Sequence, residues 1–162
     1  MPLLRDGRAV DGAPRARLCG GEPLPAAPNG VSVPLGRLAT LDGRESARID
    51  AIALAPDDDA GALPDALLQR LTLIEIDFPA YTDGRGYSHA RRLRRRGYTG
   101  ELRATGDVRP DQLLFMLRVG IDGAVLPDAV DPGLLKRTLE RFEHVYQPSY
   151  PLPVAPVVPC GA

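Results

Sequence analysis

The feature that most constrains the fold is a repeated alternation of short apolar runs with helix-like segments. The runs begin at residues 51, 73, 101 and 123, so successive starts are 22, 28 and 22 residues apart. This spacing is the length of one strand plus one helix, and such units with short links give parallel strands and right-handed crossovers. The sequence therefore predicts an α/β domain with a parallel sheet of four to five βα units. The run that begins at Val31 is the fifth strand, and Pro34 places it at an edge or a strand end.

Charge falls on only one face of two neighbouring predicted strands. Alternate residues of a strand share a face, so Glu75 and Asp77 point to one side of residues 73–78. Arg103 points to one side of residues 101–105 and can stand beside either acid. A sheet covered by helices on both faces reads as near-continuous apolar runs. The pattern favours a partial TIM-barrel-like arrangement with a polar, self-paired interior, which a second subunit could complete; an open doubly wound sheet is the alternative.

Composition divides the chain into three parts. Residues 1–30 are rich in glycine and proline and predict a poorly structured head, with at most a small hairpin around Asp6 and Gly7. Residues 31–146 carry the α/β pattern. Prolines recur every two or three residues in 147–162, which predicts an extended or disordered tail.

The predicted helices have recognisable starts and stops. Asp83, or Thr82 before it, can cap a helix that ends at Gly97. A second helix opens at Pro110 and ends at Gly120. Asp131, which a proline follows, opens a third.

Charge and cysteine content exclude several classes of protein. Twenty Lys and Arg face twenty-one Asp and Glu, so no global field directs the chain to nucleic acid or to an anionic membrane. The apolar runs are too short to span a bilayer, and the first residues lack a signal peptide's apolar core, which predicts a cytoplasmic protein. Cys19 and Cys160 read as incidental thiols. With only His89 and His144 as imidazoles, no metal site is expected.

The candidate ligand site lies in two loops at the carboxyl ends of predicted strands, where parallel α/β folds collect their ligands. Two arginines there offer planar donors for an oxyanion, and a helix start adds backbone N–H groups. The candidate residues are Asp77, Tyr81, Thr82, Asp83, Arg85, Ser88, Asp107, Arg109 and Gln112. A structural alternative is equally open: Asp83 caps the helix, two glycines permit the turn, and Arg85 bridges to Asp107. No catalytic residue and no cofactor can be assigned.

Gly84, Arg85 and Gly86 resemble the start of a dinucleotide-binding fingerprint. However, His89 stands at the third glycine position, and several residues separate the strand end from Gly84. The fingerprint needs an immediate tight turn after the strand. The sequence therefore argues against a dinucleotide site.

A run of five arginines follows this loop, from Arg91 to Arg96 with Leu93 between them. On a helix, Tyr87, Ala90 and Leu93 can form the buried stripe and leave the arginines largely solvated. A nucleic-acid site would need more basic charge and interleaved exposed aromatics. The alternatives are a charged outer face or a docking surface for an acidic partner, with candidate contacts Arg91, Arg92, Arg95 and Arg96.

The segment IDFPAYTDGRGYSHARRLRRRGYTGELRATGDVRPDQLLFMLRVGIDGA resembles the central motif of a bacterial family catalogued as domain of unknown function 934. The head segments MPLLRDGRAV, GEPLP and VPL are similar as well, so the resemblance covers about residues 1–147. Two departures are the missing tryptophan in the head and the pair Arg109-Pro110 after Gly-Asp-Val.

The resemblance implies an accessory protein or oxidoreductase component of assimilatory sulfite reduction, with the sulfite reductase haemoprotein as its partner. It implies no catalytic residues, and the residues themselves indicate no redox centre. Two other hypotheses stay open. One is a non-catalytic module that docks on the reductase through the arginine-rich helix, and the other is an unrelated enzyme with its site at the barrel mouth.

Overall fold

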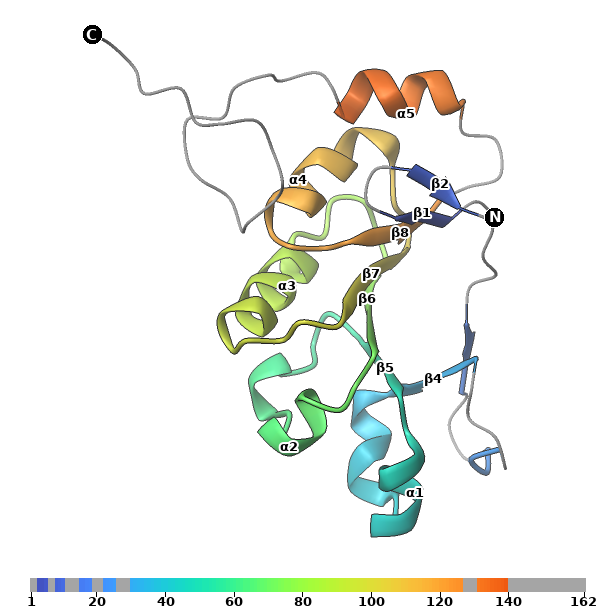
Figure 1. Cartoon of the computed structure of the whole chain (residues 1–162), viewed down its shortest axis with the longest axis vertical. Coiled ribbons are helices and arrows are strands. Elements are labelled where there is room, and N and C mark those ends of the chain that lie inside the picture. Colours follow the sequence, from blue (N-terminus) through green and yellow to red (C-terminus); the bar gives the residue numbers. More distant parts are fainter. Residues whose placement is uncertain are drawn as a thin grey trace, which may run out of the picture.

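In the residues that the structure describes, eight short strands form one curved sheet with helices along one face (Figure 1). The computed structural model describes residues 3–5, 8–10, 15–18, 22–25, 30–126 and 131–139. The order across the sheet is β2-β1-β8-β7-β6-β5-β4-β3. The strands are β1 (Leu3–Arg5), β2 (Arg8–Val10), β3 (Ala16–Arg17), β4 (Val31–Pro34), β5 (Ala51–Leu54), β6 (Leu73–Phe78), β7 (Glu101–Gly106) and β8 (Gly123–Val125).

The six strands from β3 to β8 are parallel and lie side by side in chain order. A doubly wound sheet would reverse its strand order at a switch point. The predicted partial barrel is therefore confirmed, with one parallel strand more than the four to five predicted. The additional strand is β3, which has two residues and is too short to leave an apolar run in the sequence.

The two ends of the sheet differ in how their strands pair. β1 pairs with β2 and with β8 in antiparallel register, so the hairpin predicted near the start of the chain extends the parallel sheet at its β8 edge. β3 forms the other edge. The proline-rich segment 147–162, together with Cys19, His144 and Cys160, lies outside the described residues.

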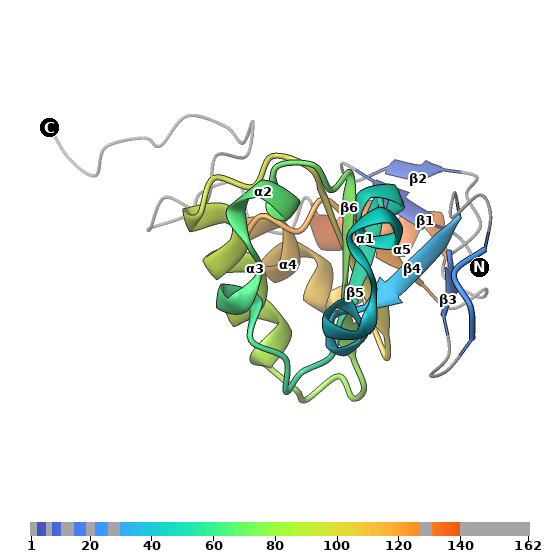
Figure 2. The same ribbon diagram turned by 90° about the horizontal axis from the view of Figure 1, so that it is seen from below.

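Helices occupy the crossovers between the parallel strands from β4 to β8, and Figure 2 shows α2, α3 and α4 on one side of β5 and β6. Gly97 and Gly120 take positive φ angles of 83° and 92°, so each ends its helix where the sequence predicted. The helices are α1 (Gly43–Arg48), α2 (Asp65–Leu68), α3 (Arg85–Arg95), α4 (Leu113–Arg118) and α5 (Pro132–Leu139), with 3₁₀ turns η1 (Leu35–Thr40), η2 (Ala60–Ala62) and η3 (Pro110–Gln112).

The apolar core lies between the helices and the convex face of the sheet. Ile74, Ile76 and Phe78 of β6 point into it and are fully buried, as is Leu102 of β7. Leu93 of α3 packs into the same cluster. Each such side chain contributes roughly 1.5–3 kcal/mol of burial free energy. The alternation of these residues with charged ones therefore sets which face of the sheet the helices cover.

The concave face carries the charged residues. Glu75 and Arg103 are register partners, and only 2% and 8% of their surfaces are exposed. Arg103 donates from Nε and Nη2 to Oε1 of Glu101, at 2.9 and 2.8 Å, while its Nη1 lies 3.8 Å from Oε1 of Glu75. The predicted pairing of Arg103 with Glu75 is confirmed. A second layer of helices on this face would be unfavourable, because it would remove water from the charged groups without supplying new partners for them.

Asp77, the other predicted partner of Arg103, pairs instead with Arg17 of β3. Nη1 of Arg17 lies 3.2 Å from Oδ2 of Asp77, and Nη2 donates to Oγ1 of Thr105 at 3.3 Å. In the sheet order, β4 and β5 lie between β3 and β6. A side chain can cross two intervening strands only inside a strongly curved sheet. The contacts of Arg17 are therefore direct evidence that the sheet is curved into a half-barrel.

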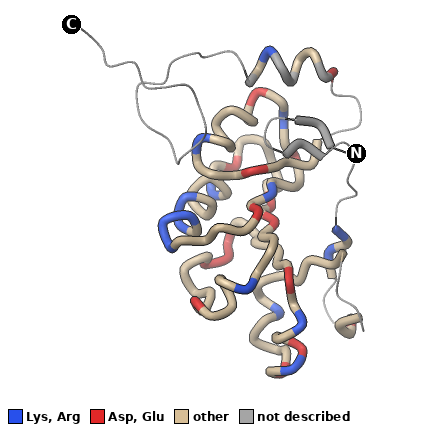
Figure 3. The backbone as a smooth tube through the Cα atoms, viewed as in Figure 1, with Lys and Arg blue, Asp and Glu red and all other residues tan. Residues whose placement is uncertain are grey.

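Figure 3 shows the arginine-rich α3 along the edge of the molecule. The sequence predicts that its five arginines are largely solvated, but one of them, Arg94, is buried. Arg94 is 6% exposed and donates to the carbonyl oxygens of Tyr98, Gly100 and Gly120, at 2.7, 2.8 and 2.9 Å. It also pairs with Asp122. Position 94 follows the buried Ala90 by four residues and therefore lies on the same helix face. The expectation of a solvated side chain is thus wrong for Arg94.

We expect Arg94→Ala to lower the free energy of unfolding by about 3 kcal/mol, since it removes the guanidinium that donates to three carbonyl groups and balances the charge of Asp122. The measurement is urea unfolding followed by circular dichroism. The control is Arg95→Ala, an exposed neighbour that we expect to change stability by less than about 0.5 kcal/mol. Equal stability of the two variants would show that Arg94 does not anchor α3.

Candidate functional site

The loops after β6 and β7 meet at the carboxyl edge of the sheet. Oδ2 of Asp107 accepts a hydrogen bond from the backbone N–H of Tyr81 at 3.1 Å. Nε2 of Gln112 donates to the carbonyl oxygen of Tyr81 at 2.8 Å and to the hydroxyl of Tyr87 at 3.3 Å. These contacts bring together the two loops from which the sequence drew its candidate ligand site.

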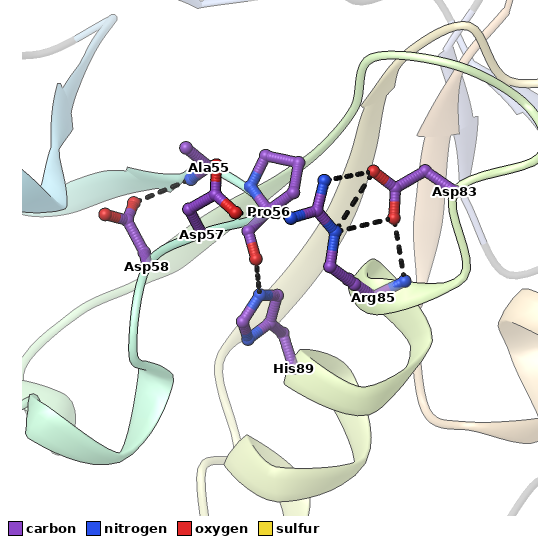
Figure 4. Close-up of polar contacts among 7 residues, drawn as sticks. All are labelled: Ala55, Pro56, Asp57, Asp58, Asp83, Arg85 and His89. Atoms are coloured by element: carbon purple, nitrogen blue, oxygen red, sulfur yellow. Dashed lines mark hydrogen bonds and ion pairs between the residues drawn. The ribbon is translucent and has the colours of Figure 1, made fainter.

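Arg85 is held by two carboxylates (Figure 4). Its Nε lies 3.0 and 3.2 Å from the two carboxylate oxygens of Asp83, and its Nη2 lies 2.7 Å from Oδ2. Its Nη1 pairs with Asp57 in the loop after β5. One alternative from the sequence has Arg85 bridge to Asp107, and that contact is wrong. Arg85 opens α3, where side chains lean toward the helix start and thus toward the neighbouring β5 loop.

The Arg85 pair changes the titration of both groups. The side-chain hydrogen bonds from Arg85, followed by the bond from its backbone N–H, lower the pKa of Asp83 from 3.8 to about 2. The side-chain hydrogen bonds with Asp83 raise the pKa of Arg85 above its ordinary range. Both groups stay charged across the physiological range, so the pair is a fixed clamp at the start of α3 rather than a proton donor or acceptor.

We expect Arg85→Ala to return the pKa of Asp83 from about 2 toward 3.8. The folded-state pKa lies below the unfolded value, so Asp83 stabilises the fold above about pH 4 and this contribution is lost as the pH falls toward 2. Carbon-detected NMR of the carboxyl group measures this pKa. Arg92→Ala, which removes an arginine bound to a different acid, is the control and should leave it unchanged. An unaltered Asp83 titration in Arg85→Ala would contradict the clamp.

The two glycines that flank Arg85 have different environments. A Cβ atom on Gly86 would lie 2.4 Å from the Phe78 ring, whereas one on Gly84 would meet nothing within 4 Å. Gly86 thus allows the first turn of α3 to approach the buried end of β6. The glycine spacing that resembled a dinucleotide fingerprint is explained here by helix packing.

We therefore expect Gly86→Ala to destabilise the fold by about 1–3 kcal/mol, because the added methyl group overpacks the contact with Phe78. Gly84→Ala is the matched control, and its stability should stay within about 0.5 kcal/mol of the parent chain. Thermal unfolding of the two variants checks the difference. The packing explanation fails if both tolerate the methyl group equally.

The acidic loop after β5 is occupied by structural contacts. Oδ2 of Asp58 accepts from the N–H of Ala55 at 2.7 Å, and Asp59 pairs with Arg92 at 2.7 Å. His89 lies with Nε2 at 3.1 Å from the carbonyl oxygen of Pro56. In the described ranges, no three potential metal ligands come together.

Arg109 has fewer ionic contacts than Arg85, the other arginine of the predicted set. Its guanidinium lies 3.4 Å from the ring centroid of Tyr81, and its Nε is 4.0 Å from Oδ1 of Asp107. The side chains of Arg109 and Asp107 are each about half exposed. A guanidinium stacked flat on an aromatic ring is oriented while its edge stays accessible to a ligand.

The remaining candidate ligand-binding residues do not share one environment. Thr82 and Ser88 are exposed, and no hydrogen bond links either side chain to the described chain. Asp77 points to the concave face, where Arg17 binds it. The sequence analysis did not select Asp57, which binds Arg85, or Arg17, which binds Asp77. Asp57 could have been found from its place after the neighbouring strand, whereas the two-residue β3 left no signal for Arg17.

The four candidate partner-binding arginines also differ. Arg91 and Arg95 are exposed, and neither has an ion pair or side-chain hydrogen bond with the described residues. Arg92 pairs with Asp59. Arg96 donates to the carbonyl oxygens of η2 and pairs with Asp65, so it ties the end of α3 to the preceding crossover.

The fold and the loop contacts define a half-barrel α/β protein whose carboxyl-end loops are joined by ion pairs and backbone hydrogen bonds. The chain belongs to the family described as bacterial protein of unknown function (DUF934), whose model matches residues 51–155. No curated protein and no solved structure matches the chain. None of the helices described is both long enough and apolar enough to cross a membrane.

Proposed function

We propose that the chain is a cytoplasmic, non-catalytic accessory protein of sulfite reduction that docks on the sulfite reductase haemoprotein through α3. One observation carries the docking role: Arg91 and Arg95 are exposed cations without a counter-charge in the described structure. The family resemblance supports the choice of partner. An acidic patch on that partner is the chemistry that this surface fits.

The spacing of the two arginines adds a physical reason. They are four residues apart on α3, where like charges repel and disfavour the helix slightly. Carboxylates of a partner would relieve this repulsion and make charge-assisted hydrogen bonds with both guanidinium groups. Exposed charges of this kind mainly accelerate association and make it depend on salt.

The loop geometry gives less support to an oxyanion site at Arg85, because Asp83 and Asp57 already bind its Nε, Nη1 and Nη2 atoms. Arg109 keeps a second proposal open, in which the chain is an oxidoreductase component that binds a small oxyanion or a cofactor. The side chain of Arg109 is about half exposed, so the edge of its guanidinium is accessible, and the group lies over the ring of Tyr81.

The test of docking is binding of the purified chain to the reductase, measured by surface plasmon resonance at low and physiological salt. We expect Arg91→Glu/Arg95→Glu to weaken binding by at least about tenfold, mostly through the association rate. Arg44→Glu, a charge reversal at an exposed arginine of α1, serves as the control and should bind nearly as well as the parent chain.

Unchanged binding of the double variant would remove the docking proposal. The oxyanion proposal has a separate readout, which is sulfite-dependent growth together with calorimetric titration of sulfite. If Arg109→Ala abolishes both while the docking variant keeps both, the loop site carries the function.

A further inference from the structure

A hollow of about 520 Å³ opens at the amino ends of β6 and β7, the opposite strand ends from the loops discussed above. Leu73, Glu101 and Arg103 line it, and all three point to the concave face of the sheet. The loops that lead into β6 and β7 complete its rim. The hollow is thus the amino-end mouth of the half-barrel.

Three arginines, Arg15, Arg70 and Arg103, surround this hollow. Arg15 donates from Nη1 and Nη2 to the two oxygens of Asp50, at 3.0 and 2.9 Å. Arg103 is held by Glu101 through its Nε and Nη2. Each guanidinium has more N–H donors than these contacts use, so it is oriented while some donors stay available. Orientation before binding reduces the entropic cost of capturing a ligand.

Arg70 differs from the other two because it has no carboxylate partner in the described chain. Its Nη2 donates to the carbonyl oxygen of Ser46 at 2.6 Å, which fixes the side chain and leaves its charge uncompensated. Gln69 and Thr99 add exposed polar groups to the lining. Glu101 is the one acid among the lining residues, while Asp50 and Glu75 lie against Arg15 and Arg103 from outside the lining. Arg70 is therefore the cation that favours a negatively charged ligand.

The inner end of the hollow supplies a further donor. Nη1 of Arg103 is 3.8 Å from Oε1 of Glu75, which is beyond hydrogen-bond range, and this buried oxygen accepts no hydrogen bond. The charge of Glu75 keeps the arginine in place without a hydrogen bond, so Nη1 of Arg103 makes no hydrogen bond within the described chain.

We propose that this hollow binds a small oxyanion, such as a carboxylate, a phosphate or a sulfur oxyanion, between Arg15, Arg70 and Arg103. Arginine suits this chemistry because its planar fork matches two oxygens at once. The site is separate from the docking surface on α3 and from Arg109, so it does not depend on the function proposed above.

The experiment is isothermal titration calorimetry of the full chain with sulfate, sulfite, phosphate and acetate, each in its own titration. We expect saturable binding of at least one anion. Arg70→Ala should weaken it by about tenfold or more, since a charge-assisted hydrogen bond is lost. Arg91→Ala removes the same charge from a surface outside the hollow, and its affinity should equal that of the parent chain.

Two further variants keep the result decisive. Arg70→Lys retains the charge but not the planar fork, and should bind with intermediate affinity even if Arg70→Ala is less stable. Arg109→Ala should bind like the parent chain. The proposal is overturned if none of the four anions binds, if the Arg70 variants bind like the parent, or if Arg109→Ala alone removes binding.

Discussion

The charged ladder on the concave face is the constraint on which the rest of the structure depends. Arg103 pairs with Glu101 of its own strand and with Glu75 of the neighbouring strand, and Arg17 reaches Asp77 across the concave face. This face cannot take a second layer of helices, because their apolar surface would strip water from charges without replacing it. The helices of the crossovers between β4 and β8 therefore lie on the other face (Figure 2), and the sheet curves around its own polar contacts. The curvature creates the amino-end hollow and gathers the carboxyl-end loops.

Several arginines of this protein stabilise the fold, and others are available for contacts at the surface. Arg94 binds the carbonyl groups of two loops, and Arg85 clamps the start of α3 to the β5 loop. A planar fork with many donors suits such positions better than an ammonium group would. Three arginines without a carboxylate partner in the described chain, Arg91 and Arg95 on α3 and Arg70 at the hollow, take part in the contacts that we propose with other molecules.

Prediction from the sequence succeeded where the signal was local or periodic. Apolar alternation placed the strands, and Gly97 and Gly120 marked helix ends through backbone conformations that other residues rarely adopt. It failed where two remote segments had to be positioned first. The partner of Arg85 is 28 positions away in Asp57, and the contact of Arg17 with Thr105 spans 88 positions. Arg94 was misplaced because a charge is ordinarily solvated, whereas here a ring of carbonyl groups receives it.

The sequence by itself determined the α/β class, the parallel crossovers and the charged inner face, and it limited the partner of Arg103 to Glu75 or Asp77. These features follow from the periodicity of residues along each strand and from the pairing of strands that follow one another in the chain. Only the tertiary structure decided which arginines remain free, which acid holds Arg85, and that a basic hollow forms at the amino ends of β6 and β7. The reason is physical: an ionic side chain's role depends on which remote oxygen atoms the curved sheet brings within reach, and no local pattern records that distance.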